Sequence, residues 1–318
     1  MHPKAARPEP QRTRATWLDA GPWAALAAAG TTAHRIYSGP DSWLERFGED
    51  LLLSFKNEAA RERVLADLPA WSAEHGCRFR RVFGKYLPRH NDERAAPLLL
   101  LGDPALPLTT VVGEEGTKFG LDFAAGYSAG LFIDQRANRG LIRRAGIGRM
   151  LNTFAYTCSF SVVAAQTGAQ TVSVDLSKKS LDRGRENFAH NGLDAGPGGG
   201  HRFLADDVLE VLPRLARKGE RFDAIILDPP TFSRGNKGRK FQVEHDLETL
   251  FLAALEVAAP QARVLLSTNC TRLDRRALEA IVRFGLKVAR RAGEMHSEPE
   301  LPDIPTGHGA RTLWVTLR

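Results

Sequence analysis

The strongest constraint on the fold is a regular alternation of expected strands and helices that begins near Gly130. Short apolar runs at residues 149–157, 171–175, 201–207, 221–230, 262–269 and 311–317 are typical of strands. Between them, residues 161–169, 177–192, 208–219, 241–258 and 273–290 have the length and periodicity of helices. The run at 221–230 is almost continuously apolar, as in a strand buried on both faces. This alternation predicts an α/β fold with a doubly wound, mostly parallel sheet.

The part of the chain before this pattern is different. Residues 1–14 are rich in Pro, Arg and Lys, and we expect them to form a flexible basic tail. Residues 15–125 mix an amphipathic segment at 42–55, a charged helix at 57–75 and an edge strand at 77–89. We therefore predict a small α+β domain over 15–125, followed by the α/β domain over 126–318.

Composition narrows the class of protein. Hydrophobic residues make up 43% of the chain, so global disorder is excluded, and no apolar stretch approaches the ~18 residues of a transmembrane helix. Cys77, Cys158 and Cys270 are odd in number and form no CxxC pair, which argues against a disulfide scaffold or a cysteine-rich zinc site. We expect a reducing, cytoplasmic location, no membrane and no metal. The net charge of +7 mildly favours an anionic partner.

A doubly wound sheet binds its ligands at the carboxyl ends of the strands, near the point where the strand order reverses. Asp175 ends the second expected strand, about 20 residues beyond the first loop, where an acid accepts hydrogen bonds from ribose hydroxyls. NAD enzymes also need glycines in the first loop for a pyrophosphate, and none lies between Asn152 and Gly168. The pattern favours S-adenosylmethionine over NAD; a surface acid is the alternative for Asp175.

The sequence Asp228-Pro229-Pro230 follows the most apolar strand. Two prolines make a rigid turn, which directs the Asp228 side chain and nearby carbonyls toward the expected cleft. Such a fixed polar group suits methyl transfer, because that reaction depends mainly on positioning. A simple strand-ending turn is the alternative, and the acids Asp175 and Asp206 at the expected spacings weaken it.

Four segments resemble a known family: GLFIDQRANR (130–139), NTFAYT (152–157), VDLSKKSLDRGRENFAHNG (174–192) and LDPPTF (227–232). They are similar to bacterial class I S-adenosylmethionine-dependent methyltransferases of large-subunit ribosomal RNA. That group includes the 5-methylcytosine enzyme of type I and the guanine-N7 domain of the fused K/L type, and residues 227–246 most resemble the latter. The resemblance spans roughly residues 77–318. It implies a Rossmann-like class I methyltransferase domain, S-adenosylmethionine as cofactor, and 23S rRNA or a large-subunit precursor as partner.

The resemblance also implies site residues. The cofactor residues would be Asn152, Phe154, Tyr156, Thr157, Asp175, Leu176, Asp206, Asp207, Asp228 and Arg136, with Asp175 on the ribose and Asp206 on the adenine. The catalytic residues would be Asp228, Pro229, Pro230, Phe232 and Cys270. Asp134 and Arg136 match the family pattern beside the pocket; a buried ion pair between the two domains is the alternative for them. Cys158 departs from the family, which usually has glycine there, and a side chain at that position affects how closely the backbone approaches the cofactor.

The target base stays open at this stage. Cys270 matches the cysteine that attacks cytosine C6 in 5-methylcytosine enzymes, but guanine-N7 enzymes carry a similar segment with Asn at the cysteine position. Cys270 as a small apolar residue, and Phe232 as either a stacking or a core residue, are alternatives. Arg234, Lys237, Arg239 and Lys240 form a basic loop suited to RNA phosphates, which Arg80, Arg81, Lys85 and Arg89 extend. A small-molecule or protein methyltransferase, or an inactive RNA-binding homologue, is the competing interpretation.

Overall fold

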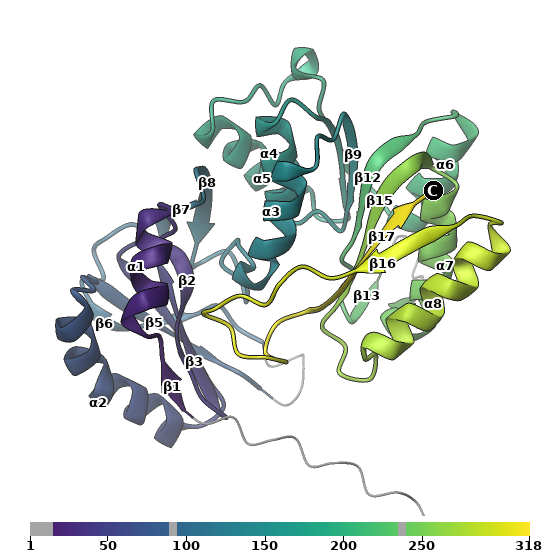
Figure 1. Ribbon diagram of the computed structural model, residues 1–318. Helices are drawn as coiled ribbons and strands as arrows, with labels where there is room; N and C mark the ends of the chain where they lie inside the picture. The colour runs from purple at the N-terminus through teal and green to yellow at the C-terminus, as the bar shows by residue number, and fades with distance from the viewer. Residues whose placement is uncertain (1–14, 89–93, 235–239) are drawn as a thin grey trace, which may run out of the picture. The chain divides into compact units, whose positions relative to one another are not determined.

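The computed structural model describes residues 15–88, 94–234 and 240–318, which form two compact units (Figure 1). Unit 1 comprises Met1–Thr110 and Phe123–Ala129; unit 2 comprises Val111–Asp122 and Gly130–Arg318. The expected tail at 1–14, together with Arg89, Lys237 and Arg239, lies outside the described residues. Within the described ranges, no helix combines the length and apolar character needed to cross a membrane.

Unit 1 is a six-stranded sheet with two helices, α1 (Ala20–Ala28) and α2 (Glu58–His75). The strands follow chain order: β1 (Thr16–Trp17), β2 (Ala33–Ser38), β3 (Ser42–Phe47), β4 (Asp50–Phe55), β5 (Arg81–Tyr86) and β6 (Leu98–Gly102). Only the β4–β5 pair is parallel, because α2 carries the chain back between them. The Asn57 side chain caps α2 by accepting the Ala60 N–H at 2.9 Å.

Three expectations for unit 1 are corrected. Residues 42–55 are not one amphipathic segment but the hairpin β3–β4, which turns at Gly48 with a φ of 68°. The expected edge strand, β5, lies between β4 and β6. Its Arg81 is fully buried and donates two hydrogen bonds to Asp50, at 2.9 and 3.0 Å, so this residue cannot extend a basic surface.

Unit 2 contains the predicted doubly wound sheet, in the order β11-β10-β9-β12-β15-β17-β16. The strands are β9 (Arg149–Thr153), β10 (Gln170–Asp175), β11 (Arg202–Ala205), β12 (Phe222–Leu227), β15 (Ala258–Thr268), β16 (Gly293–His296) and β17 (Arg311–Leu317). The first five are parallel, whereas β17 is antiparallel to both neighbours. The strand order reverses between β9 and β12, which is where a ligand is expected. The sequence did not predict β16.

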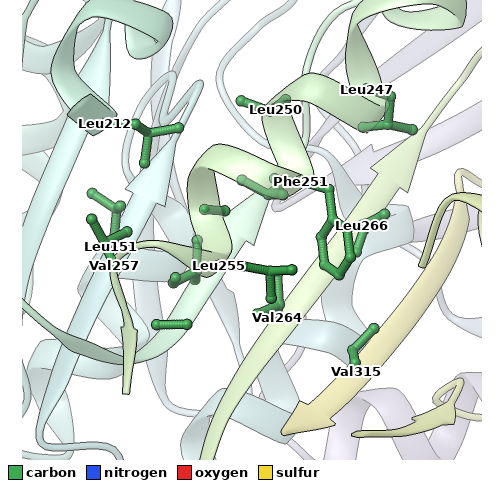
Figure 2. Packing of buried hydrophobic residues seen from close by; sticks show 14 of the residues in the cluster. Leu151, Leu212, Leu247, Leu250, Phe251, Leu255, Val257, Val264, Leu266 and Val315 are labelled. Carbon is green, nitrogen blue, oxygen red and sulfur yellow. The ribbon is translucent and has the colours of Figure 1, made fainter. Parts of the chain in front are cut away.

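Helices cover both faces of this sheet (Figure 1): α3 (Arg136–Arg144), α4 (Ser159–Gln166) and α5 (Lys178–His190) on one, and α6 (Val208–Arg217), α7 (Val243–Leu255) and α8 (Arg275–Val288) on the other. Ser177 caps α5 as predicted, accepting the Ser180 N–H at 3.1 Å. The second face holds a large apolar cluster, where Phe251 and Leu255 of α7 pack on Val264 and Leu266 of β15 (Figure 2). Burial of these side chains fixes the sheet that carries the site.

The hairpin β7 (Thr109–Glu114) and β8 (Thr117–Asp122) accounts for a difference from the sequence-based boundary at 125/126. Asn187 of α5 and Asn191, which follows the end of α5, accept the backbone N–H groups of Gly120 and Lys118, at 2.7 and 2.8 Å. These bonds group residues 111–122 with unit 2, while 123–129 stay with unit 1. A short second hairpin, β13 (Phe232–Arg234) and β14 (Lys240–Gln242), follows β12.

Candidate functional site

A cavity of about 320 Å³ opens at the carboxyl ends of the strands of unit 2, at the reversal of strand order. Its walls come from the segment before β9, the loop after β9, the ends of β10 and β12, and the start of α6. The lining residues are Phe132, Asp134, Gln135, Phe154, Tyr156, Asp175, Leu176, Ser177, Asp207, Val208, Leu209, Asp228, Pro229, Pro230, Ser233, Phe241 and Asn269.

The charged residues described in the wall of this cavity are all acidic. Four aspartates line it, and among its described lining residues there is no Lys, Arg or His. An acidic, partly apolar cavity disfavours a pyrophosphate, because nothing there balances the negative charge of phosphate. S-adenosylmethionine carries a sulfonium and an ammonium group, so the residues present fit this cofactor. No cluster of three potential metal ligands occurs in the described part of the chain.

The loop after β9 is held in an unusual backbone conformation. Phe154, Tyr156 and Cys158 have φ values of 53°, 47° and 61°, in the left-handed region that non-glycine residues rarely adopt. Asp175 supports the loop: its Oδ2 accepts the Tyr156 N–H at 2.8 Å, and its Oδ1 accepts the Ser177 N–H at 2.8 Å. Thr157 donates to the carbonyl of Gly130 at 2.5 Å. Strain of this kind persists only where neighbours impose it, and it concentrates at functional sites.

Cys158 occupies the position where the resembling family has glycine. Its side chain is fully buried, and burial raises the pKa of its thiol to about 12. The thiol lies over Gly184 of α5, where a Cβ would come within 2.4 Å of the Cys158 Sγ. The side chain therefore points away from the cavity into a space that Gly184 leaves open.

Six of the ten expected cofactor residues line the cavity, namely Phe154, Tyr156, Asp175, Leu176, Asp207 and Asp228. Asn152 and Thr157 are buried behind the wall, where Asn152 donates to Ser161 at 2.9 Å. Arg136 is also buried and pairs with Asp303, inside unit 2 rather than between domains. None of these three residues lines the cavity.

Asp206 is the remaining cofactor residue, and the structure points to its neighbour instead. Asp206 pairs with Arg214 and accepts the Asp207 N–H at 2.8 Å, outside the cavity. Asp207 caps α6 by accepting the Leu209 N–H at 2.9 Å, and its side chain lies at the cavity wall. Of these two acids, Asp207 lines the cavity and Asp206 does not.

Asp228 lies where β12 ends, with Pro229 and Pro230 beside it in the cavity wall. Gln135 Nε2 donates to its Oδ2 at 3.2 Å and to Ser267 Oγ at 2.8 Å. Burial raises the pKa of Asp228 to about 6; hydrogen bonds from Ser267 and Gln135 oppose this shift, whereas the nearby charge of Asp134 adds to it. Burial thus holds the pKa of Asp228 well above the ordinary value of a carboxyl.

Two expected catalytic residues do not line the cavity. Cys270 is 4% exposed, belongs to the apolar core cluster and places its Sγ 3.3 Å from Glu244 Oε1. The preceding Asn269 faces the cavity in its place. Phe232 is 41% exposed outside the lining, whereas Phe132 is 46% exposed within it and packs 5.6 Å from the Tyr156 ring.

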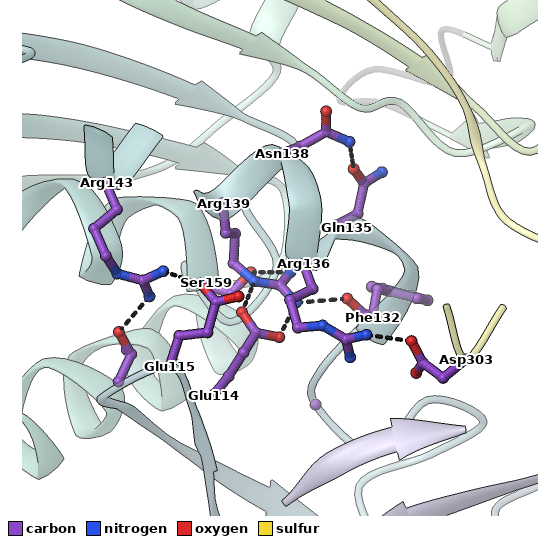
Figure 3. A network of polar contacts seen from close by, with 12 residues as sticks. Glu114, Glu115, Phe132, Gln135, Arg136, Asn138, Arg139, Arg143, Ser159 and Asp303 are labelled. Atoms are coloured by element: carbon purple, nitrogen blue, oxygen red, sulfur yellow. Dashed lines mark hydrogen bonds and ion pairs between the residues drawn. The ribbon is translucent and has the colours of Figure 1, made fainter. Parts of the chain in front are cut away.

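Several residues that line the cavity are not among the site residues predicted from the sequence, including Phe132, Gln135, Phe241 and Asn269. The segment of residues 130–139 did carry a signal, since its motif directed attention to Asp134 and Arg136. Gln135 stands between them, and the short 3-10 turn Ile133–Gln135 rotates its side chain inward. Figure 3 shows Gln135 with Asn138, and Arg139 beside Glu114 in the network that holds this turn.

Sequence comparisons match this site to known proteins. Residues 54–315 match the model of a family of S-adenosylmethionine-dependent methyltransferases. The chain is 41% identical over 167 residues to ribosomal RNA large subunit methyltransferase K/L of Psychrobacter, covering 52% of this chain and 20% of that protein. It is 33% identical over 201 residues to ribosomal RNA large subunit methyltransferase I of Aeromonas salmonicida, covering 62% and 50%. The chain thus spans at most about half the length of these two curated relatives.

Solved structures agree on the architecture. A methyltransferase in complex with SAH superposes with a TM-score of 0.78 at 25% identity, covering 92% of this chain and 77% of that one. An S-adenosylmethionine-dependent methyltransferase from Agrobacterium tumefaciens gives a TM-score of 0.69 at 22% identity, with 90% of each chain covered. The second likeness concerns the fold alone.

Proposed function

The chain belongs to the S-adenosylmethionine-dependent methyltransferase family, and on this basis we propose that it methylates a base of large-subunit ribosomal RNA. The acidic cavity supports the cofactor half of this proposal, because its four aspartates complement a cationic donor. The named relatives support the substrate half, with 23S rRNA or a large-subunit precursor as the expected partner. A ribosomal substrate entails a cytoplasmic location.

We further propose guanine N7 as the acceptor, and one observation carries this choice. The end of β15 presents Asn269 to the cavity, while Cys270 lies behind it in the core cluster beside Glu244. Methylation of cytosine C5 needs a thiolate on C6 and a base that removes the C5 proton. A thiol buried outside the cavity does not serve the first step.

Guanine N7 needs neither group. S-adenosylmethionine supplies an electrophilic methyl group when it is bound. The N7 lone pair forms the new N–C bond, the sulfur keeps the electron pair of the broken S–C bond, and no proton is lost. The purine gains positive charge during this step. An ionised Asp228 at the cavity wall stabilises that charge through a fixed, partly desolvated carboxylate.

Phe132 supports binding of a base rather than a small polar acceptor. Its ring is half exposed within the cavity lining, and its backbone carbonyl accepts a 3.0 Å hydrogen bond from Arg139, which is itself paired with Glu114. A fixed, open aromatic ring suits stacking with an extruded base. Asn269 adds an amide that offers both a donor and an acceptor to the base edge.

The test is mass spectrometry of ribosomal RNA nucleosides from a deletion strain, followed by methylation of that RNA in vitro with labelled donor. We expect the deletion strain to lack one 7-methylguanosine, which the purified protein restores. Loss of a 5-methylcytidine would overturn the choice of base. An unchanged nucleoside profile with transfer to a protein or metabolite would overturn the RNA substrate, and absent cofactor binding would favour an inactive homologue.

A further inference from the structure

Three buried side chains form a line of hydrogen bonds that ends at the cavity. Trp314 of β17 donates from Nε1 to Asn138 Oδ1 at 2.8 Å. Asn138 of α3 donates from Nδ2 to Gln135 Oε1 at 2.8 Å (Figure 3). Gln135 donates from Nε2 to Ser267 and Asp228. Each of the first three side chains is at most 3% exposed, so water does not compete for these bonds.

The direction of this line follows from its first member. The indole of Trp314 is a donor only, so the oxygen of the Asn138 amide must face it. The nitrogen of Asn138 must then face Gln135, which turns the Gln135 oxygen toward Asn138. The Gln135 nitrogen is left pointing at Asp228 and Ser267. Reversing the Gln135 amide would bring two N–H groups together and two acceptors together, and burial makes both contacts costly.

The fixed orientation of the Gln135 amide determines which hydrogen bonds Asp228 accepts. Ser267 Oγ accepts from Gln135 and keeps its own proton, which it donates to the Asp228 carboxylate. Asp228 thus receives hydrogen bonds from both Gln135 and Ser267. An ionised carboxyl accepts both, whereas a protonated one has to turn its own hydrogen away from them.

We propose that Trp314, Asn138 and Gln135 are positioning residues that hold Asp228 as an ionised acceptor facing the target base. This inference rests on the proposed function, because it assigns a supporting structure to the same site. It gives Asn138 and Trp314, which do not line the cavity, an effect on the methyl-transfer step.

The other charges near Asp228 act in opposite directions. Asp134, on the turn before α3, raises the pKa of Asp228, and Arg139 of α3 lowers it. Arg139 is itself engaged by Glu114 of β7. Asp134 is fixed by the Ala310 N–H, which donates to its Oδ2 at 2.9 Å. Because these contacts do not pass through Asn138, an uncharged substitution at 138 tests the line of hydrogen bonds separately.

The experiment compares Asn138→Leu and Trp314→Phe with the unmodified protein. Asn138→Leu frees the Gln135 amide to reverse, and Trp314→Phe removes only the indole donor. We expect the Asp228 titration to move upward by about 0.5–1 pH unit, less for Trp314→Phe. For Asn138→Leu, we expect kcat to fall about two- to fivefold at pH 6 and only slightly at pH 8, with the KM for S-adenosylmethionine unchanged.

Two further measurements separate the outcomes. The Asp228 titration is read without substrate, by infrared difference between each protein and its Asp228→Asn form. Val315→Ala is the control: it opens the core on the same strand, so it should lower Tm without moving this titration. An unmoved titration in Asn138→Leu, or an equal loss of kcat at pH 6 and pH 8, overturns the inference. Absence of RNA methylation by the unmodified protein instead overturns the proposed function.

Discussion

The backbone N–H of Tyr156 donates a 2.8 Å hydrogen bond to the Oδ2 of Asp175, joining the loop after β9 to the end of β10. Tyr156 lies in the left-handed region, with a φ of 47°, so this bond stabilises a conformation that the chain would otherwise avoid. The other oxygen of Asp175 accepts the Ser177 N–H. Asp175 shapes the loop, and because it also lines the cavity we expect it to accept hydrogen bonds from a ribose.

Substitution at Asp175 should separate these tasks. Asp175→Ala removes both, and we expect the Kd for S-adenosylmethionine to rise about 10–100-fold, the loss of one or two charge-assisted hydrogen bonds. Asp175→Asn keeps one acceptor oxygen, so its affinity for S-adenosylmethionine should lie between that of the unmodified protein and that of Asp175→Ala. Titration calorimetry measures this. Equal affinity in all three proteins would contradict a ribose contact.

The two acids that follow β11, Asp206 and Asp207, provide a test variant and its control. Asp207→Ser keeps a helix-capping oxygen for α6 and removes the carboxylate from the cavity wall. We expect it to weaken S-adenosylmethionine binding about tenfold with little loss of Tm. Asp206→Ala, which removes the exposed pair with Arg214 and the acceptor of the Asp207 N–H, should leave the affinity within about twofold. If Asp206→Ala is the more damaging change in calorimetry, the contact belongs to Asp206.

Asp206 and Asp207 illustrate which features of the site can be predicted from the sequence and which cannot. The alternation of apolar strands and amphipathic helices predicts the sheet, its reversal point and Asp175 and Asp228 at strand ends, because all of these depend on local pattern and topology. Which of two neighbours faces the cavity, Asp206 or Asp207, and Asn269 or Cys270, depends on how the chain is rotated by one residue at the end of a strand. The sequence pattern does not determine this rotation. Capping of α6 by Asp207 and core packing around Cys270 set that rotation, and the packing around Cys270 involves residues distant in the sequence.

Cys158 and Gly184 should be energetically coupled. In Gly184→Ala the new Cβ would lie 2.4 Å from the Cys158 Sγ, and we expect this overpacking to destabilise the fold by about 1–3 kcal/mol. Cys158→Gly removes the sulfur and suits the φ of 61°. In that background Gly184→Ala should become neutral or stabilising, because alanine favours a helix interior. Urea unfolding of the four proteins tests this, and additive effects would show that the two residues do not interact.

Cys270 and Asn269 give the sharpest test of the acceptor base. Cys270→Ala removes a buried thiol outside the cavity, so we expect RNA methylation within about threefold of the unmodified protein. Asn269→Ala removes an amide that lines the cavity and should lower kcat/KM about tenfold or more, the value of one hydrogen bond in a desolvated site. The cysteine mechanism would be established instead if Cys270→Ala abolished transfer and the unmodified protein formed a covalent adduct with 5-fluorocytidine RNA.

Asp228 should reduce stability at the pH where the enzyme needs its charge. Burial raises its pKa from an ordinary value of 3.8 to about 6, so in the native state the ionised form is disfavoured. Above pH 6 this costs up to about 3 kcal/mol of unfolding free energy. As the pH falls from 6 to below 4, the native carboxyl takes up its proton first, and the cost disappears.

Asp228→Asn should therefore raise Tm at pH 8 while abolishing most methyl transfer, and its stability advantage should vanish near pH 4. The pKa of Asp50 is shifted in the opposite direction. Burial acts against its charge, but hydrogen bonds from Arg81 and Arg80 prevail and lower its pKa. Asp50→Asn should destabilise the protein at pH 8 and progressively less as the solution is acidified below about pH 4. Urea unfolding at pH 8, 6 and 4 compares the two. A gain from Asp228→Asn that is the same at every pH would mean that packing, and not the buried charge, is responsible.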